Sequence, residues 1–351
     1  YEEMEKKIRQ ACADHPGKPV FVCTHEAAKD TCYNSGSWGN PVIRRVLNKY
    51  PQVVLFSGHT HGSLRNELAL WQGEFTAVDV CCLQEWHGIS VGTPLKGKQD
   101  YGVVVTEVYP SRLVIRRFDV RDGSEIFPDR RWIVPLPFDP KTAPLRVEER
   151  LRTARPGRFA ADAKVTCTPD ATPFTKVKVS FPAVKNEEDV GLYRIEIARR
   201  DKTGGWEKFA ICEIFSEFYL RPQERKGVLE REMSSGFFDA GETEYRFSVT
   251  PIGFCGTVGQ ELSTVCKVPA MKPGKVIWRC DNPMEELDFR CGWAKNEEEM
   301  RKAKLVPKKD GWYVVNTLSW LSLKPGVWDL PKGTKLRLVA EMSLDQPPVI
   351  E

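Results

Sequence analysis

The chain has 351 residues, of which 28% are charged and 41% hydrophobic, and its formal net charge is +4. This length suits two or three globular domains. Lys and Arg alternate with Asp and Glu, so the sequence has no basic stripe of the kind that binds nucleic acid. No apolar run is long enough to span a bilayer and no secretory signal is visible, so we expect no transmembrane segment.

The first 50 residues predict a helix, a strand and a second helix. One face of the first helix collects Tyr1, Met4, Ile8, Ala11 and Cys12. Residues 18–25 read KPVFVCTH, a short apolar strand that ends at His25, and residues 42–50 have helical spacing. Taken alone, His25 is more often an ordinary surface residue than a metal ligand.

Two further histidines follow the next predicted strand. Residues 53–62 read VVLFSGHTHG, so the strand stops at Gly58 and is followed by His59 and His61. Side chains at i and i+2 of an extended segment point the same way, and both imidazoles can therefore serve one metal centre or two adjacent ones. Gly58 permits the sharp exit from the sheet. The string indicates a metal site.

The order of these elements resembles the C-terminal half of the calcineurin-like metallophosphoesterases, whose motifs end with a lone His and then Gly-His-x-His. Residues 71–79, 101–109 and 113–135 look like the later strands of that family, so the resemblance covers residues 1–135. It implies an α/β fold, the C-terminal half of a four-layer α/β/β/α sandwich. It also implies that His25 and His59 bind the second metal of a pair.

By the same resemblance His61 binds the first metal, and two divalent or trivalent ions (Zn, Fe or Mn) act together on a phosphate-ester or nucleotide-like substrate. The loop after His25 would face that substrate through Tyr33, Asn34 and Trp38. The family also uses Asp-x-His, Gly-Asp and Gly-Asn-His motifs, which the residues before His25 do not contain. We expect the catalytic residues upstream of Tyr1, and this chain alone to be inactive.

The remaining histidines and the cysteines carry weaker signals. His15 lies beside Pro16 in a predicted turn and His87 follows Trp86 in a loop, so ordinary surface roles are favoured for both. The 11 cysteines contain no Cys-x-x-Cys pair, and we expect most of them to be small buried residues. Pairing of Cys255 with Cys266, or of Cys280 with Cys291, stays open.

The rest of the chain predicts β domains. Residues 136–160 are a linker rich in proline and charge, in which Pro156 and Gly157 break any helix. Residues 161–270 contain short alternating strands that predict an antiparallel β-sandwich, and the last hairpin is similar to that of a fibronectin type III domain. Residues 271–351 predict a small β domain rich in tryptophan, with strands at 275–278, 312–315 and 335–341.

Two classes of function follow. The first is a metal-dependent phosphoesterase whose β domains act as scaffold, lid or surface attachment. The alternative is a non-enzymatic surface protein whose β domains bind glycan or a protein partner. Five tryptophans between residues 278 and 328 invite the glycan hypothesis, although tryptophan more often belongs to a core or a domain interface. By analogy with secreted relatives we expect export to the periplasm or the cell exterior.

Overall fold

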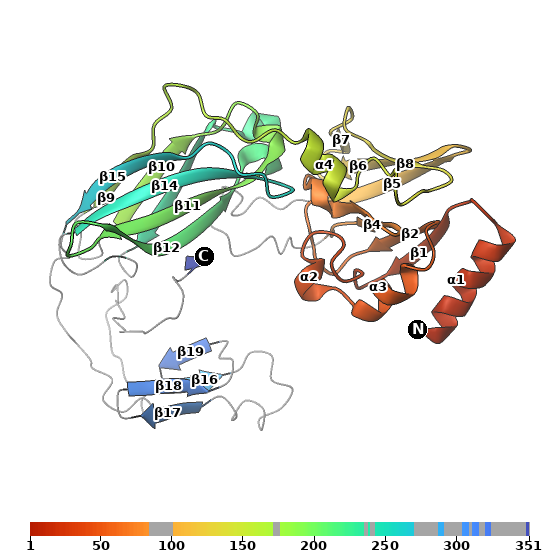
Figure 1. Ribbon diagram of the computed structural model, residues 1–351, viewed down its shortest axis with the longest axis horizontal. Helices are drawn as coiled ribbons and strands as arrows, with labels where there is room; N and C mark the ends of the chain where they lie inside the picture. The colour runs from red at the N-terminus through yellow and green to blue at the C-terminus, as the bar shows by residue number, and fades with distance from the viewer. Residues whose placement is uncertain are drawn as a thin grey trace. The chain divides into compact units, whose positions relative to one another are not determined.

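The computed structural model describes residues 1–83, 101–170, 176–234, 238 and 243–269, together with short strands between 287 and 350. The chain divides into two compact units (Figure 1). The first comprises Tyr1–Met271 with Met342–Glu351, and the second comprises Lys272–Glu341.

A small sheet in the first unit places the ends of three parallel strands side by side. Its order is β1-β2-β4-β3, with β3 antiparallel to β4. The strands are β1 (Val20–Thr24), β2 (Val53–Ser57), β3 (Leu70–Gln72) and β4 (Thr76–Asp79). Thr24 pairs with Ser57, and Ser57 pairs with Asp79, so the carboxyl ends of these strands meet at one edge of the sheet.

Helices cover one face of this sheet, as Figure 1 shows. They are α1 (Glu2–Asp14), α2 (Ser35–Trp38) and α3 (Pro41–Leu47). The α3 helix begins after Asn40, whose side-chain oxygen accepts hydrogen bonds from the backbone N–H groups of Val42 and Ile43. The predicted N-terminal amphipathic helix is confirmed as α1, which buries Ile8 against the sheet.

Alternation along β2 divides its side chains between two apolar cores. Val53 and Leu55 pack with Ile8 and α3 on the helix side, whereas Val54 and Phe56 pack on the opposite side. A second, antiparallel sheet covers that opposite side and contains β5 (Gly102–Tyr109), β6 (Arg112–Asp119), β7 (Ser124–Ile126) and β8 (Trp132–Pro135). The layer order is therefore helix, sheet, sheet.

The described residues before 136 form these three layers, and the four-layer sandwich expected from the sequence is not seen in them. The outer face of the second sheet carries charge. On this face Arg116 of β6 donates to Glu107 on β5 and to Glu125 on β7, and Val105 is 44% exposed. Polar groups that face water in this way do not require a covering layer.

The segment 136–160 runs back along the first sheet. Leu145 N donates to Gln72 Oε1 at 2.8 Å, and Arg146 forms an isolated parallel bridge with Gln72 on β3. The helix α4 (Val147–Thr153) follows and ends before Pro156. Arg150 then donates to the backbone oxygen of Glu67, in the short helix η1 (Glu67–Ala69).

Residues 166–268 form two antiparallel sheets around a single apolar core. One sheet has the order β13-β10-β9 and the other the order β15-β14-β11-β12-β20, where the two-residue strand β20 (Val349–Ile350) is parallel to β12. The strands are β9 (Thr166–Asp170), β10 (Lys176–Pro182), β11 (Val190–Arg200), β12 (Trp206–Phe215), β13 (Val228–Ser234), β14 (Thr243–Gly253) and β15 (Leu262–Val268). Alternate residues of β10, namely Val177, Val179 and Phe181, face the core.

Connections within this part of the chain contain three short helical turns, η2 (Glu187–Asp189), η3 (Glu217–Tyr219) and η4 (Pro222–Glu224). The second unit pairs β16 (Leu287–Arg290) with β19 (Trp320–Leu323), and β17 (Lys304–Lys308) with β18 (Gly311–Val315). The strand predicted at 312–315 lies in β18, whereas those predicted at 275–278 and 335–341 fall outside the described residues, as does the Cys280–Cys291 pair.

Candidate functional site

The strands β1 and β2 bring two of the predicted histidines together. His25 directly follows Thr24, the last residue of β1, and Gly58 N donates to the backbone oxygen of His25 at 3.1 Å. His59 comes next, so both histidines emerge at the carboxyl edge of the sheet. Parallel pairing of β1 with β2 thus converts a sequence separation of 34 residues into contact.

The two imidazoles are close enough to share a metal ion. His59 Nδ1 lies 3.0 Å from His25 Nε2, and the ring centroids are 4.9 Å apart at 70°. Two nitrogens at this spacing, each at the usual Zn–N distance of about 2.0–2.1 Å, would subtend an angle of roughly 95° at one ion. His25 is exposed and His59 is partly buried, which leaves the pair open to solvent. At this distance one ring can donate a hydrogen bond to the other, and the same two nitrogens could bind one ion when neither carries a proton.

The loop that carries His59 and His61 has an unusual backbone. His59 has φ 68° and His61 has φ 49°, both in the left-handed region. This region costs a residue with a Cβ roughly 1–2 kcal/mol and persists where surrounding contacts enforce it. Between the two histidines, the hydroxyl of Thr60 donates to Oδ2 of Asp79, the last residue of β4.

Asp79 is the buried carboxylate of this site. It is 0% exposed, and its Oδ1 accepts a hydrogen bond from Cys81 N at 2.9 Å. Burial raises the pKa of Asp79 to about 6, while hydrogen bonds from Thr60, from the backbone N–H groups of Cys81 and Gly62, and the charge of His61 act in the opposite direction. At neutral pH the group is therefore mostly the ionised acceptor that these donors require.

Gly62 is required beside this carboxylate. A Cβ atom built on Gly62 would lie 2.9 Å from Asp79 Oδ2 and 3.6 Å from Tyr33 Cδ1. Real Cβ atoms essentially never approach another atom as closely as the first of these distances. The glycine at the end of the Gly-His-x-His-Gly string thus lets the loop close over Asp79.

His61 lies on this loop and interacts with the charge of Asp79. Within the described ranges, no group of three or more His, Cys, Asp or Glu side chains is arranged to hold a metal ion. The structure thus joins His25 with His59 and leaves His61 outside a three-residue cluster.

The three predicted substrate residues have different positions. Trp38, at the end of α2, is 55% exposed and its ring makes an edge-on contact with His59, with centroids 5.8 Å apart. Tyr33 is partly buried against Gly62, and burial raises its pKa to about 12. Asn34 adopts φ 61° as the residue before α2. Only Trp38 is placed both beside the histidine pair and in solvent.

Sequence reasoning missed Asp79 and Thr60. Asp79 was recognised only as the end of a strand, and nothing in its local sequence distinguishes it from other strand-terminal aspartates. The signal that could have found both residues is the parallel order of β2 and β4, which brings their carboxyl ends together.

The cysteines of the site have no metal-binding arrangement among the residues described. Cys32 is buried, and burial together with the charge of Asp79 raises its thiol pKa. Cys23 is exposed on β1, and Cys81 is buried beside Asp79. Cys255 and Cys266, the pair left open by the sequence, are free thiols.

Of the other two histidines, the structure describes His15 and not His87. His15 ends α1, is exposed, and accepts a hydrogen bond from Gln52 Nε2 through its backbone oxygen, as expected for a turn residue. His87 lies outside the described residues.

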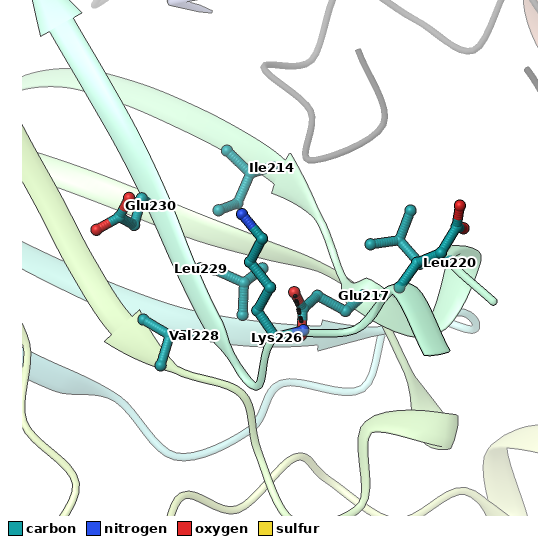
Figure 2. A pocket seen from close by; sticks show the side chains of 8 residues that line it. Ile214, Glu217, Leu220, Lys226, Val228, Leu229 and Glu230 are labelled. Carbon is teal, nitrogen blue, oxygen red and sulfur yellow. Dashed lines mark hydrogen bonds between the residues drawn. The ribbon is translucent and has the colours of Figure 1, made fainter. Parts of the chain in front are cut away.

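A separate hollow of about 480 Å³ lies in the β-sandwich between β12, η3 and β13 (Figure 2). Its buried carboxylate, Glu217, accepts hydrogen bonds from the backbone N–H groups of Lys226 and Gly227 at 2.9 and 2.6 Å. Those bonds fix the turn that leads into β13. Glu217 therefore has a structural role here, and no histidine lines the hollow.

No protein-family model matches this chain, and no curated protein matches it. Among the described residues, no helix has the length and apolar character needed to cross a membrane.

Proposed function

We propose that this chain supplies histidine ligands to a two-metal centre that hydrolyses phosphate esters, in a calcineurin-like phosphoesterase. The observation that supports the proposal is the approach of His59 Nδ1 to within 3.0 Å of His25 Nε2 at the ends of two parallel strands. When bound, such a metal pair lowers the pKa of a water molecule and stabilises charge on phosphoryl oxygens.

In that proposal the residues of this chain hold the metal ions and orient the bound ester. His25 and His59 bind one ion through the nitrogens that face each other, and His61 contributes to the neighbouring ion. Histidines alone do not neutralise two dications, so carboxylate ligands must come from a segment outside the histidine loop. Zn, Fe and Mn all accept imidazole ligands, and the metal identity stays open.

Trp38 would line the entrance on the solvent side. Its exposed ring next to His59 provides a flat apolar surface for the organic part of a phosphate ester or nucleotide-like substrate. Tyr33 and Asn34 would act indirectly, by shaping the loop and the start of α2.

The fold-level part of the proposal extends beyond the three layers described. We propose that a further helical layer completes a four-layer sandwich in the whole enzyme. We also propose that the strand order β13-β10-β9 against β15-β14-β11-β12 belongs to a fibronectin type III-like domain. Export, with the β domains as scaffold or surface attachment, is part of the same proposal.

Metal binding by the 351-residue chain tests the proposal directly. Co²⁺ and Zn²⁺ titrations, followed by calorimetry and by the visible spectrum of Co²⁺, compare the native chain with H25A, H59A and the control H15A. We expect H25A and H59A to weaken binding at least tenfold, since each removes a ligand, and H15A to leave it unchanged.

Hydrolysis is then measured on a longer protein that supplies the carboxylate motifs, with a phosphomonoester and a phosphodiester that carry chromogenic leaving groups. We expect the longer protein to hydrolyse these substrates, and we expect H59A to abolish the hydrolysis. If the native chain binds neither ion and the longer protein shows no turnover, the hydrolase proposal is wrong and binding by the β domains becomes the function to test.

A further inference from the structure

The histidine loop needs an external support. His59 and His61 both adopt left-handed backbone conformations, at φ 68° and φ 49°, and only Thr60 separates them. Two such residues together cost a few kcal/mol relative to ordinary conformations. A loop of this kind keeps one shape only where its neighbours determine it.

Asp79 provides that support from the adjacent strand. Its two carboxylate oxygens accept from Thr60 Oγ1 and from Cys81 N, and the backbone N–H of Gly62 also donates to the carboxylate. The donors from Thr60 and Gly62 flank His61, and the Asp79 side chain is fully buried. The rigid end of β4 is thereby tied to both sides of the second histidine.

We propose that Asp79 is a positioning residue that holds His59 and His61 in place through Thr60 and Gly62. The affinity of the histidine site for metal then depends on a carboxylate that touches no metal. The role in metal affinity rests on the proposed function, whereas the hold on the loop exists in the metal-free chain.

An ionised carboxylate suits this position better than its neutral isostere. The N–H groups of Gly62 and Cys81 can only donate, and the Asp79 carboxylate accepts from both of them, from Cys81 through Oδ1. In Asp79→Asn an NH₂ group replaces one acceptor oxygen, so the side chain can accept fewer of these bonds. The substitution keeps the volume of the side chain but leaves a buried donor unsatisfied, which costs about 1–3 kcal/mol locally.

The chain offers a matched control for the Thr60 contact. Thr60→Val removes the hydroxyl that reaches Asp79, while Thr60→Ser retains it. Thr76 lies on β4 and is 1% exposed, and its Oγ1 has no hydrogen-bond partner among the described residues. Thr76→Val is therefore the same chemical change at a buried position of the strand that carries Asp79, made where no loop contact is lost.

A second control addresses the loss of a buried carboxylate in general. Glu217 is 2% exposed and accepts from the backbone N–H groups of Lys226 and Gly227 in the β-sandwich. Glu217→Gln therefore alters a buried carboxylate that accepts from backbone donors, as Asp79 does, but in a different pair of sheets. It is expected to lower the melting temperature and to leave the histidines unaffected.

The first measurement uses the metal-free 351-residue chain. The ring Cε1–H signals of the five histidines and the amide exchange of Gly62 and Cys81 are followed by NMR at pH 8. We expect D79N and T60V to shift the His59 and His61 signals, and D79N to speed exchange at both amides. T60S, T76V and E217Q should leave these readouts at their native values. Unchanged histidine signals and exchange in D79N would overturn the proposal.

The second measurement is Co²⁺ affinity in the same variants. We expect D79N and T60V to weaken it 10–100-fold, the range found when residues that orient metal ligands are replaced, and T60S to restore it. Loss of thermal stability with native Co²⁺ affinity would show Asp79 to be merely structural and would also overturn the proposal. A native chain that binds no Co²⁺ would instead count against the proposed function, and the NMR result alone would then decide whether Asp79 holds the loop.

Discussion

The buried guanidinium of Arg117 donates to Oε1 of the partly buried Glu67 at 3.0 Å. The other carboxylate oxygen of Glu67 accepts from Trp132 Nε1, also at 3.0 Å, and the Arg117 guanidinium lies over the Trp132 ring. Burial by itself raises the pKa of Glu67, but the charges of Arg117 and Arg150 outweigh it and bring the pKa below the usual value. The carboxylate therefore remains charged between the two sheets.

Replacement of Arg117 should be far more costly than replacement of its neighbour Arg116. Arg117→Met leaves the Glu67 charge without its Arg117 partner, and we expect a loss of about 3 kcal/mol in the free energy of unfolding, the low end for a buried pair because the Glu67 side chain is 20% exposed. Arg116 forms ion pairs with Glu107 and Glu125 at the surface, so Arg116→Met should cost under about 1 kcal/mol. Urea denaturation of the two variants measures both values. Equal losses would contradict the assignment of Glu67 to a buried pair.

A methyl group at Gly62 should destabilise the chain. A Cβ there meets Asp79 Oδ2 at 2.9 Å, and relief of the contact requires the buried Asp79 side chain or the loop to move. We expect Gly62→Ala to cost about 1–3 kcal/mol, as overpacking does in a tight interior. The control is Gly36→Ala in α2, where the nearest atom is Asp30 Oδ1 at 3.4 Å. A melting temperature of G62A equal to or above that of G36A would rule out the predicted contact.

Glu187 should make the stability of the β-sandwich depend on pH. Burial raises its pKa to about 7 from an ordinary value of 4.5, while the hydrogen bond from Glu217 N acts in the opposite direction. The folded-state pKa of Glu187 lies above the unfolded one. Between about pH 4.5 and 7 the folded chain therefore keeps a proton on Glu187 that the unfolded chain has released. Stability is therefore highest below about pH 4.5 with respect to this group and falls as the pH rises to about 7.

We expect this fall to be roughly 1–2 kcal/mol after allowance for partial exposure of the side chain. Glu187→Gln removes the titrating carboxyl group and should reduce the pH dependence of the free energy of unfolding between pH 4.5 and 7. Its neighbour Glu188 pairs with Arg155 at the surface, and its charge makes only a minor contribution to the raised pKa of Glu187, so Glu188→Gln serves as the control and should keep most of the native slope. Parallel native and E187Q curves across this range would show that Glu187 titrates normally.

Short apolar runs in the sequence were enough to place His25 and His59 at the ends of β1 and β2, because such runs, and the glycine that follows the second one, are local signals. The contact between these histidines needed one further inference, parallel pairing across a helix. Their partner Asp79 could not be assigned in this way, since it depends on the register of a third strand that joins Ser57 to Asp79. Similarly, Arg117 and Glu67 are 50 residues apart in the sequence, and neither has a local pattern that marks it as a member of an ion pair.

The backbone of the histidine loop was also beyond sequence reasoning. His59 and His61 lie in the left-handed region that glycine and asparagine favour, so residue preference argues against the conformation actually found. The number of layers is a different case. A resemblance in motifs implied four, and the described residues before 136 contain three.

The return of residues 145–146 to Gln72 has a practical consequence for anyone who shortens the chain. Gln72 belongs to β3, the outermost strand of the first sheet, and its side chain and backbone are both occupied by this segment. A truncation at residue 135 would uncover an open strand edge, which readily recruits the strands of other molecules and leads to aggregation. A soluble version of the first domain should therefore extend through α4, to Thr153 or beyond.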